Sequence, residues 1–377
     1  MKILHTADWH LGYRQYGMGV REDDFAKPLE EIGDIAVREQ VDAVLVAGDL
    51  FDSYRPPASA VQAAKKFGDR MNAFNIPVLA IDGNHDASSG RWSLLCGFIP
   101  LGRKIGDLPM PAIVRDVKFS GIDFCRPQQL IDRLLEMETA KVDLQGGVLA
   151  LHLEIADLAA YSTAMSVKDL EPHLDALNVG YVALGHIHNP VEKTTERGRI
   201  YRYSGATEMN DLSELGPKTV DLVTVTDGTY TRETLTLKTR HFEVVDIDTV
   251  EAIDEKLVPI LNDPETFWLV KVNLSAPGKP IARVEEVLKD RLYRLIPYGN
   301  KSIEEQVERT RVVVGLKDAI SAFFAPDSDE AALISRMIDT PVQVKAIAQE
   351  YAETAKTGGG QIRETRDPIP PVKPEVK

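Results

Sequence analysis

Short apolar runs alternate with longer amphipathic segments over roughly the first 240 residues, and no other feature limits the fold as strongly. Residues 41–48 (VDAVLVAG) and 76–83 (IPVLAIDG) are almost continuously apolar, which is typical of strands buried on both faces. Between the strand-like runs, residues 23–40 and 57–75 repeat apolar side chains at helical spacing,. Pro28 predicts a kink in the first of these helices,. Strand–helix alternation followed by a run of strands predicts a layered α/β sandwich.

The pattern changes after Arg240 and divides the chain. We expect a first domain over residues 1–240 and a small α/β module over residues 241–315, with helices at 250–263 and 282–295. A helical region over 316–355 follows, and the Gly- and Pro-rich residues 356–377 are expected to be disordered,.

Composition excludes several classes of protein. The chain of 377 residues has no apolar stretch long enough to cross a bilayer and no secretory signal at its start, so we expect a cytoplasmic protein with no membrane contact. Its two cysteines, Cys96 and Cys125, predict buried free thiols,. A net charge of −14 is unfavourable for binding nucleic acid,. A local basic groove, bound metal ions or a partner subunit can offset that average.

Polar residues follow the apolar runs at five separate points. They are Asp8 and His10 in ADWH, Asp49 and Asp52 in AGDLFD, Asn84, His85 and Asp86 in DGNHDA, His152 in LALHLE, and His186 and His188 in GHIH. Because the carboxyl ends of strands line the functional crevice of open α/β sheets, we expect these side chains to converge.

The mixture of side chains indicates a metal site. Imidazole, carboxylate and amide groups together fit Mn²⁺, Fe²⁺ or Zn²⁺. The candidate ligands are Asp8, His10, Asp49, Asn84, His152, His186 and His188. They are too many for one tetrahedral ion and suit two ions bridged by Asp49, an arrangement that serves phosphoryl displacement. In an extended segment His186 and His188 point the same way, so each can serve one ion.

In this order the motifs resemble those of the calcineurin-like metallophosphoesterases. ILHTADWHLG and VAGDLFDSYRPP are more similar still to the nuclease subunits of DNA double-strand-break repair complexes, the SbcD type of bacteria and the nuclease of the eukaryotic MRN complex. The resemblance covers roughly residues 1–101 and the later histidines. Beyond about Arg240 it depends only on the layout of the modules.

The resemblance implies a four-layer α-β-β-α sandwich, a capping domain over residues 241–315 and a site with two Mn²⁺ ions, for which Mg²⁺ can substitute. One ion would take Asp8, His10, Asp49 and His188, and the other Asp49, Asn84, His152 and His186. His85 would be catalytic rather than a ligand, stabilising the transition state or protonating the leaving oxygen, and Asp86 would orient it.

The same resemblance implies partners. DNA ends, single strands and hairpins would be the substrates, a homodimer would form through residues 61–74 or 90–100, and residues 316–355 would bind the coiled-coil base of an SbcC-type SMC-like ATPase. One departure concerns the reaction. Archaeal and eukaryotic members carry a histidine where this chain has Asp52, which either helps to place the phosphate or only supports its loop.

Further residues near the motifs carry alternative interpretations. Aromatic and basic side chains could touch a DNA backbone or belong to a solvated loop; they are Tyr13, Arg14, Tyr16, Arg21 and Arg55,. His5 and Trp9 are expected in the core.

Three functions compete. The first is a Mn²⁺-dependent nuclease, acting as a 3′-to-5′ exonuclease and as a single-strand or hairpin endonuclease with the ATPase at DNA ends. The second is a two-metal phosphoesterase for a small molecule or a phosphoprotein, and the third is a non-catalytic scaffold for the ATPase.

Overall fold

The computed structural model describes residues 1–86, 92–102, 111–158, 165–211, 214, 216–247, 249–257, 267–273, 280–288 and 293–298. Contacts divide the chain into two compact units, of which the first is mainly Met1–Val245 and the second starts at Asp246. Among the described residues no helix has the length and apolar character needed to cross a membrane.

The first of two six-stranded sheets has the order β12–β11–β1–β2–β3–β4. Its strands are β1 (Lys2–Thr6), β2 (Ala43–Ala47), β3 (Val78–Ile81), β4 (Ile99–Pro100), β11 (Thr219–Thr226) and β12 (Thr229–Thr236). Strands β1 to β4 are parallel, whereas β11 and β12 are antiparallel additions at one edge.

The second sheet has the order β5–β6–β7–β8–β10–β9. Its strands are β5 (Ala112–Val114), β6 (Val117–Ile122), β7 (Gly147–His152), β8 (Val179–Gly185), β9 (Val191–Thr194) and β10 (Ile200–Tyr203). Strands β6, β7, β8 and β10 are parallel, and β5 and β9 run antiparallel at the two edges.

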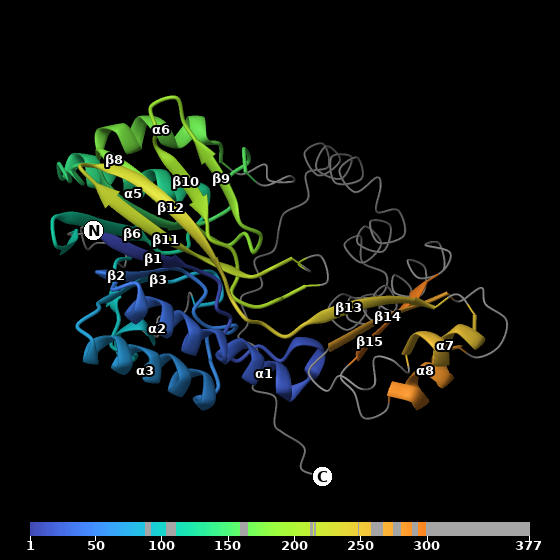
Figure 1. Ribbon diagram of the computed structural model, residues 1–377. Coiled ribbons are helices and arrows are strands. Elements are labelled where there is room, and N and C mark those ends of the chain that lie inside the picture. Colours follow the sequence, from blue (N-terminus) through green and yellow to red (C-terminus); the bar gives the residue numbers. More distant parts are fainter. Residues whose placement is uncertain are drawn as a thin grey trace, which may run out of the picture. The chain divides into compact units, whose positions relative to one another are not determined.

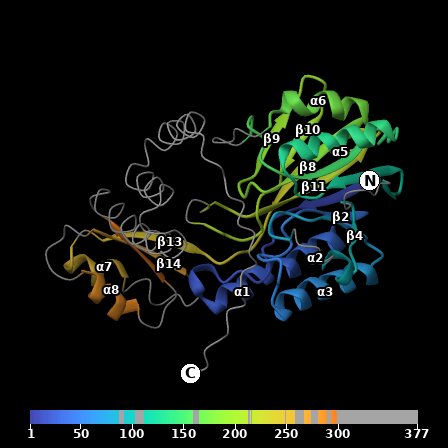
Figure 2. The ribbon, with the colours of Figure 1, turned by 180° about the vertical axis from the view of Figure 1, so that it is seen from behind.

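The sheets pack face to face with helices on both outer faces (Figures 1 and 2). Helices α1 (Gly19–Ala26), α2 (Pro28–Arg38) and α3 (Ala58–Ala73) lie on one side, and α5 (Pro127–Thr139) and α6 (Val167–Ala176) on the other. Three apolar clusters fill the layers, one between the sheets and one beneath each helical layer. Because both faces of each sheet are covered, β2 and β7 are buried along their whole length,. The expected four-layer sandwich is confirmed.

Two expectations about single elements are wrong. Residues 23–40 do not form one kinked helix, because Pro28 occupies the first turn of α2, where its missing N–H costs nothing,. Residues 282–295 do not form one helix either. Helix α8 (Pro280–Leu288) ends before Tyr293, which begins strand β15 (Tyr293–Tyr298).

After residue 241, the described residues form a three-stranded sheet in the order β13–β14–β15. Strand β13 is Phe242–Ile247 and β14 is Phe267–Asn273. Helices α7 (Glu251–Leu257) and α8 bury Ile253, Leu257, Val284 and Leu288. The helical region expected over 316–355 and the tail expected over 356–377 lie outside the described residues.

Candidate metal centre

Sharp turns at the ends of three strands bring the candidate ligands together. Asp8, His10, Asp49 and His186 have φ angles of 52°, 44°, 49° and 94°, a region that non-glycine residues rarely adopt. The turns after β1 and β2 are joined by hydrogen bonds from the N–H of Trp9 and of His10 to the Asp49 carbonyl, at 2.9 and 3.1 Å. Several unfavourable backbone conformations in one place are characteristic of functional sites.

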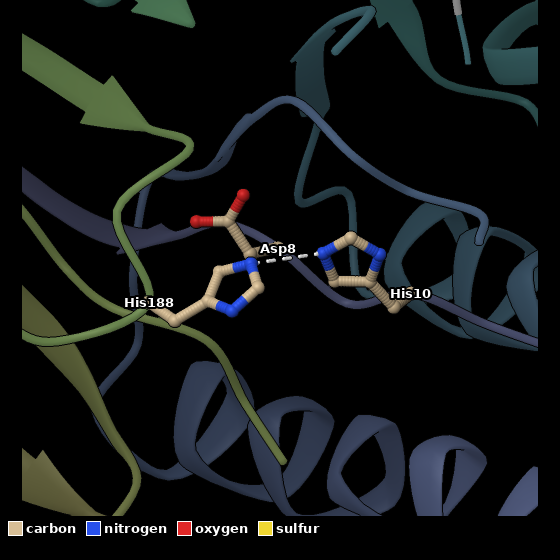
Figure 3. Close-up of side chains that lie close together, drawn as sticks. All are labelled: Asp8, His10 and His188. Carbon is tan, nitrogen blue, oxygen red and sulfur yellow. Dashed lines mark hydrogen bonds between the residues drawn. The ribbon is translucent and has the colours of Figure 1, made fainter. Parts of the chain in front are cut away.

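One group of side chains comprises Asp8, His10 and His188, whose ligand atoms lie within 4.8 Å of one another. Figure 3 shows the two imidazole rings facing each other with Asp8 beside them, and their Nε2 atoms are 3.2 Å apart. His10 Nε2 also lies 3.7 Å from Asp49 Oδ2.

A second group comprises Asn84, His152 and His186. Asn84 Oδ1 lies 3.0 Å from His152 Nε2 and 2.9 Å from His186 Nδ1. Asp49 Oδ2 is 3.3 Å from His152 Nε2, so the same carboxylate oxygen lies near both groups. The backbone of Gly83 packs directly against this residue, because a Cβ at position 83 would overlap the Asp49 carboxylate. Asp49 therefore lies between the two groups, and the assignment of these ligands to two ions stays a prediction.

The donor set fits divalent cations. His152 Nδ1 donates to the Ala47 carbonyl at 2.8 Å, and His188 Nδ1 donates to Glu214 Oε1 at 2.7 Å. With Nδ1 protonated, each neutral ring directs the lone pair of Nε2 into the site. These lone pairs meet the carboxylate oxygens of Asp49 and Asp8. Such a set of acceptors repels itself unless a positive charge lies among them.

The pKa values of the site's histidines and of Asp49 show how strongly these charged groups act on one another. Burial by itself would lower the pKa of His152, but its hydrogen bond to Asp49 and the charges of Asp49 and Asp8 raise that pKa to about 9. Burial opposes ionisation of Asp49, yet His152 holds the pKa of this carboxyl well below its usual range. Burial and the charge of His152 lower the pKa of His186. The site therefore stabilises a positive charge at His152 but not at His186, and a metal ion would displace the proton of His152,.

His85 stands beside the two groups with 40% of its side chain exposed. Its Nδ1 donates to the Asp52 carbonyl at 2.7 Å, and its ring lies edge-on to His10 with centroids 4.8 Å apart. The Asp52 carboxylate is 3.7 Å from His10 Nδ1 and 3.9 Å from His85 Nδ1. The Asp52 carbonyl thus orients the His85 ring, and both expected roles of Asp52, placing a phosphate or supporting its loop, stay predictions.

The expectation that Asp86 orients His85 is wrong in its detail. The Asp86 carboxylate accepts the backbone N–H groups of Leu50, Phe51 and Gly83, at 2.9, 2.9 and 3.1 Å. It joins the turn after β2 to the turn after β3, and the contact that orients His85 comes from the Asp52 carbonyl instead. Burial and the charge of Asp49 raise the pKa of Asp86 to about 6.

Comparison with known proteins agrees with this geometry. Residues 1–190 match the calcineurin-like phosphoesterase family. The chain belongs to this family. The resemblance expected from the motifs is therefore confirmed, and the family uses a centre of two metal ions.

Three curated relatives of this phosphoesterase share the description DNA double-strand break repair protein Mre11. The protein of Methanosarcina mazei is 30% identical over 352 residues, which cover 89% of this chain and 54% of the relative. That of Saccharolobus solfataricus is 27% identical over 334 residues, covering 84% and 85%. That of Haloferax volcanii is 32% identical over 250 residues, covering 66% and 54%. The chain thus spans about half the length of two of these relatives.

The loop residues of the phosphoesterase differ in their access to a substrate. Arg21 is fully buried and hydrogen-bonded to Gln15, Asp24 and Glu208, so both alternatives for it, a DNA contact and a residue of a solvated loop, are wrong. Arg14 is exposed and paired with Glu22 at 2.7 Å. Arg55 is exposed and lies over the Tyr54 ring at 5.4 Å.

The remaining aromatic and histidine residues near the motifs are more enclosed. Tyr13 packs edge-on against Phe25, and Tyr16 is half-buried in a short turn. His5 and Trp9 are fully buried, as expected. Of the two thiols, which are free as expected, Cys96 is buried and Cys125 is half-buried.

Glu214 is a site residue that motif analysis missed. Its buried carboxylate accepts from His188 Nδ1, and at 2.8 Å from Lys218 Nζ. Carboxylates in this position fix the orientation of a metal-binding imidazole and raise its basicity. The sequence offers no signal for it, because Glu214 lies 26 residues from its partner in no recognisable motif.

We predict that Glu214→Gln weakens metal binding at the His188 group. The amide keeps the size of the side chain but removes the charge that orients His188, so the affinity for Mn²⁺ should fall about 10- to 100-fold. Titration of the metal-free protein, followed by calorimetry or by the electron paramagnetic resonance signal of free Mn²⁺, measures the change. Glu171→Gln is the matched control, because Glu171 pairs with Arg199 and contacts none of the candidate ligands. Equal affinities in wild type and Glu214→Gln would contradict the assigned role.

Proposed function

We propose that this chain is a Mn²⁺-dependent DNA nuclease of double-strand-break repair. It would degrade duplex ends as a 3′-to-5′ exonuclease and cut single strands and hairpins as an endonuclease. The single observation that carries the proposal is the pair of ligand groups around Asp49 with the exposed His85 beside them. Support for DNA as the substrate comes from the names of the relatives, whose similarity extends well past residue 190.

The chain's own residues have separable tasks in this proposal. Bound metal ions would activate water and neutralise the phosphate. Asp8 and Asp49 balance that positive charge, and His188 and His152 are held in one tautomer by Glu214 and Ala47. The Asp52 carbonyl holds Nδ1 of His85, and Nε2 makes no hydrogen bond with a described residue. When the ring is protonated, Nε2–H can donate to the phosphate or to the leaving oxygen.

The net negative charge of the chain affects how it would bind DNA. The net charge of −14 repels a phosphate backbone over most of the surface,. Metal ions and exposed cations near the site, such as Arg55, would offset the repulsion locally. We further propose that residues 316–355, which lie outside the described residues, bind an SbcC-type ATPase that controls access of duplex DNA, so that the protein works at DNA ends in the cytoplasm.

We predict that His85→Gln strongly slows cleavage without abolishing metal binding. The glutamine cannot supply a proton, so cleavage of a 5′-labelled duplex oligonucleotide in Mn²⁺ should slow about 100-fold or more, while the Mn²⁺ affinity should change little. His173→Gln is the matched control, because His173 pairs with Glu138 away from the site and should leave cleavage unchanged.

The same assay separates the competing functions. A wild-type protein that hydrolyses small phosphodiesters but cuts no oligonucleotide, alone or with the ATPase, would favour the small-molecule or phosphoprotein alternative. Full activity of His85→Gln would show instead that the proton comes from another group.

We also propose a homodimer, and its two candidate segments are adjacent. A Cβ on Gly68 of α3 would overlap the carbonyl of Cys96, at the end of α4 (Trp92–Leu95), so the two segments pack closely. Leu94 and Leu95 are 47% and 60% exposed beside this contact. Exposed leucines on neighbouring helical segments form a surface that a second copy can cover.

We predict that Leu94→Glu combined with Leu95→Glu converts the dimer into a monomer, because two charges would be buried without partners. Sedimentation velocity measures the mass. Hydrolysis of a small phosphodiester should persist and serves as the folding control. The control variant is Ile113→Glu, which changes an exposed residue on β5 of the other sheet. A mass that stays dimeric in the double variant, or a wild-type monomer, would contradict this surface.

A further inference from the structure

The loop between β6 and α5 borders the second ligand group and carries an exposed aromatic ring. Phe124 lies 6.2 Å from the ring of His152 and 6.2 Å from that of His186, measured between centroids, and its plane is inclined by 29° to that of His186. Its backbone N–H donates to the Asp82 carbonyl at 2.8 Å. The ring is therefore held at the site by both its backbone and its neighbour.

The exposure of Phe124 is not explained by packing. The residue remains 38% exposed, although it stands beside buried carboxylates and imidazoles. Phe67 and Phe119, in contrast, are buried in the apolar clusters. An aromatic surface left accessible beside a polar reaction centre is available to a flat ligand group.

The loop that carries Phe124 also carries a basic side chain. Arg126, two residues further on, is exposed, and its guanidinium makes no ion pair or hydrogen bond with any residue that the structure describes. Its backbone N–H donates to Gln129 Oε1 at 3.1 Å, which fixes this end of the loop at the start of α5. An aromatic side chain and a basic one on the same short loop are the two elements that bind unpaired nucleic acid, by stacking on bases and by pairing with phosphates.

We propose that Phe124 and Arg126 form a nucleotide platform beside His186. Phe124 stacks on the base of a nucleotide next to the scissile phosphate, and Arg126 pairs with a neighbouring phosphate. Both faces of a base inside a duplex are already covered, so the nucleotide on this platform is unpaired. The inference rests on the proposed nuclease function and deepens it, because the substrate at the metals becomes a frayed end or a hairpin loop.

The test uses single-stranded oligonucleotides that are intact or carry one abasic residue at successive positions around the cleavage site. Phe124→Ala should raise KM for the intact strand about tenfold, the size expected for loss of one stacked base. An abasic residue at the stacked position should raise KM of the wild type by a similar factor. Combining the variant with that substrate should add nothing, because both changes remove the same contact.

Further variants separate stacking from a merely structural role. Phe124→Leu keeps apolar packing against His186 but lacks an aromatic face, so it should behave like Phe124→Ala on DNA and like wild type in Mn²⁺ affinity. Ile113→Ala, which removes an exposed apolar side chain on β5 at the far edge of the second sheet, should have no effect. Arg126→Gln should weaken binding of intact and abasic strands equally and reduce the salt dependence of binding by about 0.7 in slope.

Three results would overturn the platform. If Phe124→Ala has an unchanged KM while the wild type cuts normally, the platform is contradicted and the proposed nuclease function still stands. Equal losses on intact strands and on strands abasic at every position, together with weaker Mn²⁺ binding, would make Phe124 a support for His186 only. A wild type that cuts no oligonucleotide would remove the proposed function, and the platform with it.

Discussion

Repulsion among converging lone pairs is the constraint on which the rest of this structure depends. The Nε2 atoms of His10 and His188 face each other at 3.2 Å, and Asp49 Oδ2 lies 3.3 Å from His152 Nε2. Without a cation or a proton this arrangement is unfavourable. Three apolar clusters hold the strands that carry these residues, so the stability of the sandwich maintains a site that would not assemble by itself.

A surrounding layer of hydrogen bonds converts that scaffold into a specific site. Three imidazole rings each donate one hydrogen bond from Nδ1 to a fixed acceptor: His152 to the Ala47 carbonyl, His85 to the Asp52 carbonyl and His188 to the Glu214 carboxylate. These bonds fix the tautomer and the orientation of each ring. Asp86 does the same for the backbone, because its carboxylate joins the turns after β2 and β3. Pre-positioned groups lose little freedom when metal and substrate arrive, which is how a rigid fold promotes phosphoryl transfer.

The sequence predicted the sandwich and the convergence of the motifs, because strand length and strand-end polarity are local properties. Asp8 and Asp49 follow buried runs and His152 ends one, so periodicity alone could place all three at strand ends. Contacts between distant segments gave no such signal. The buried pairing of Arg21 with Glu208, the support of His188 by Glu214 and the position of Phe124 beside His186 all depend on how separate loops meet in space. Pro28 was misread because its effect depends on whether it lies within a helix or at the start of one.

The stoichiometry of metal binding tests the central claim most directly. Metal-free protein titrated with Mn²⁺ should take up two ions per chain. Asp49→Asn should weaken both sites, because one carboxylate oxygen lies near both ligand groups. Asp42→Asn, which alters a carboxylate that pairs with Arg115, should still bind two ions, and thermal melting would establish that both variants are folded. Binding of a single ion by the wild type, or of two ions with undiminished affinity by folded Asp49→Asn, would contradict the account.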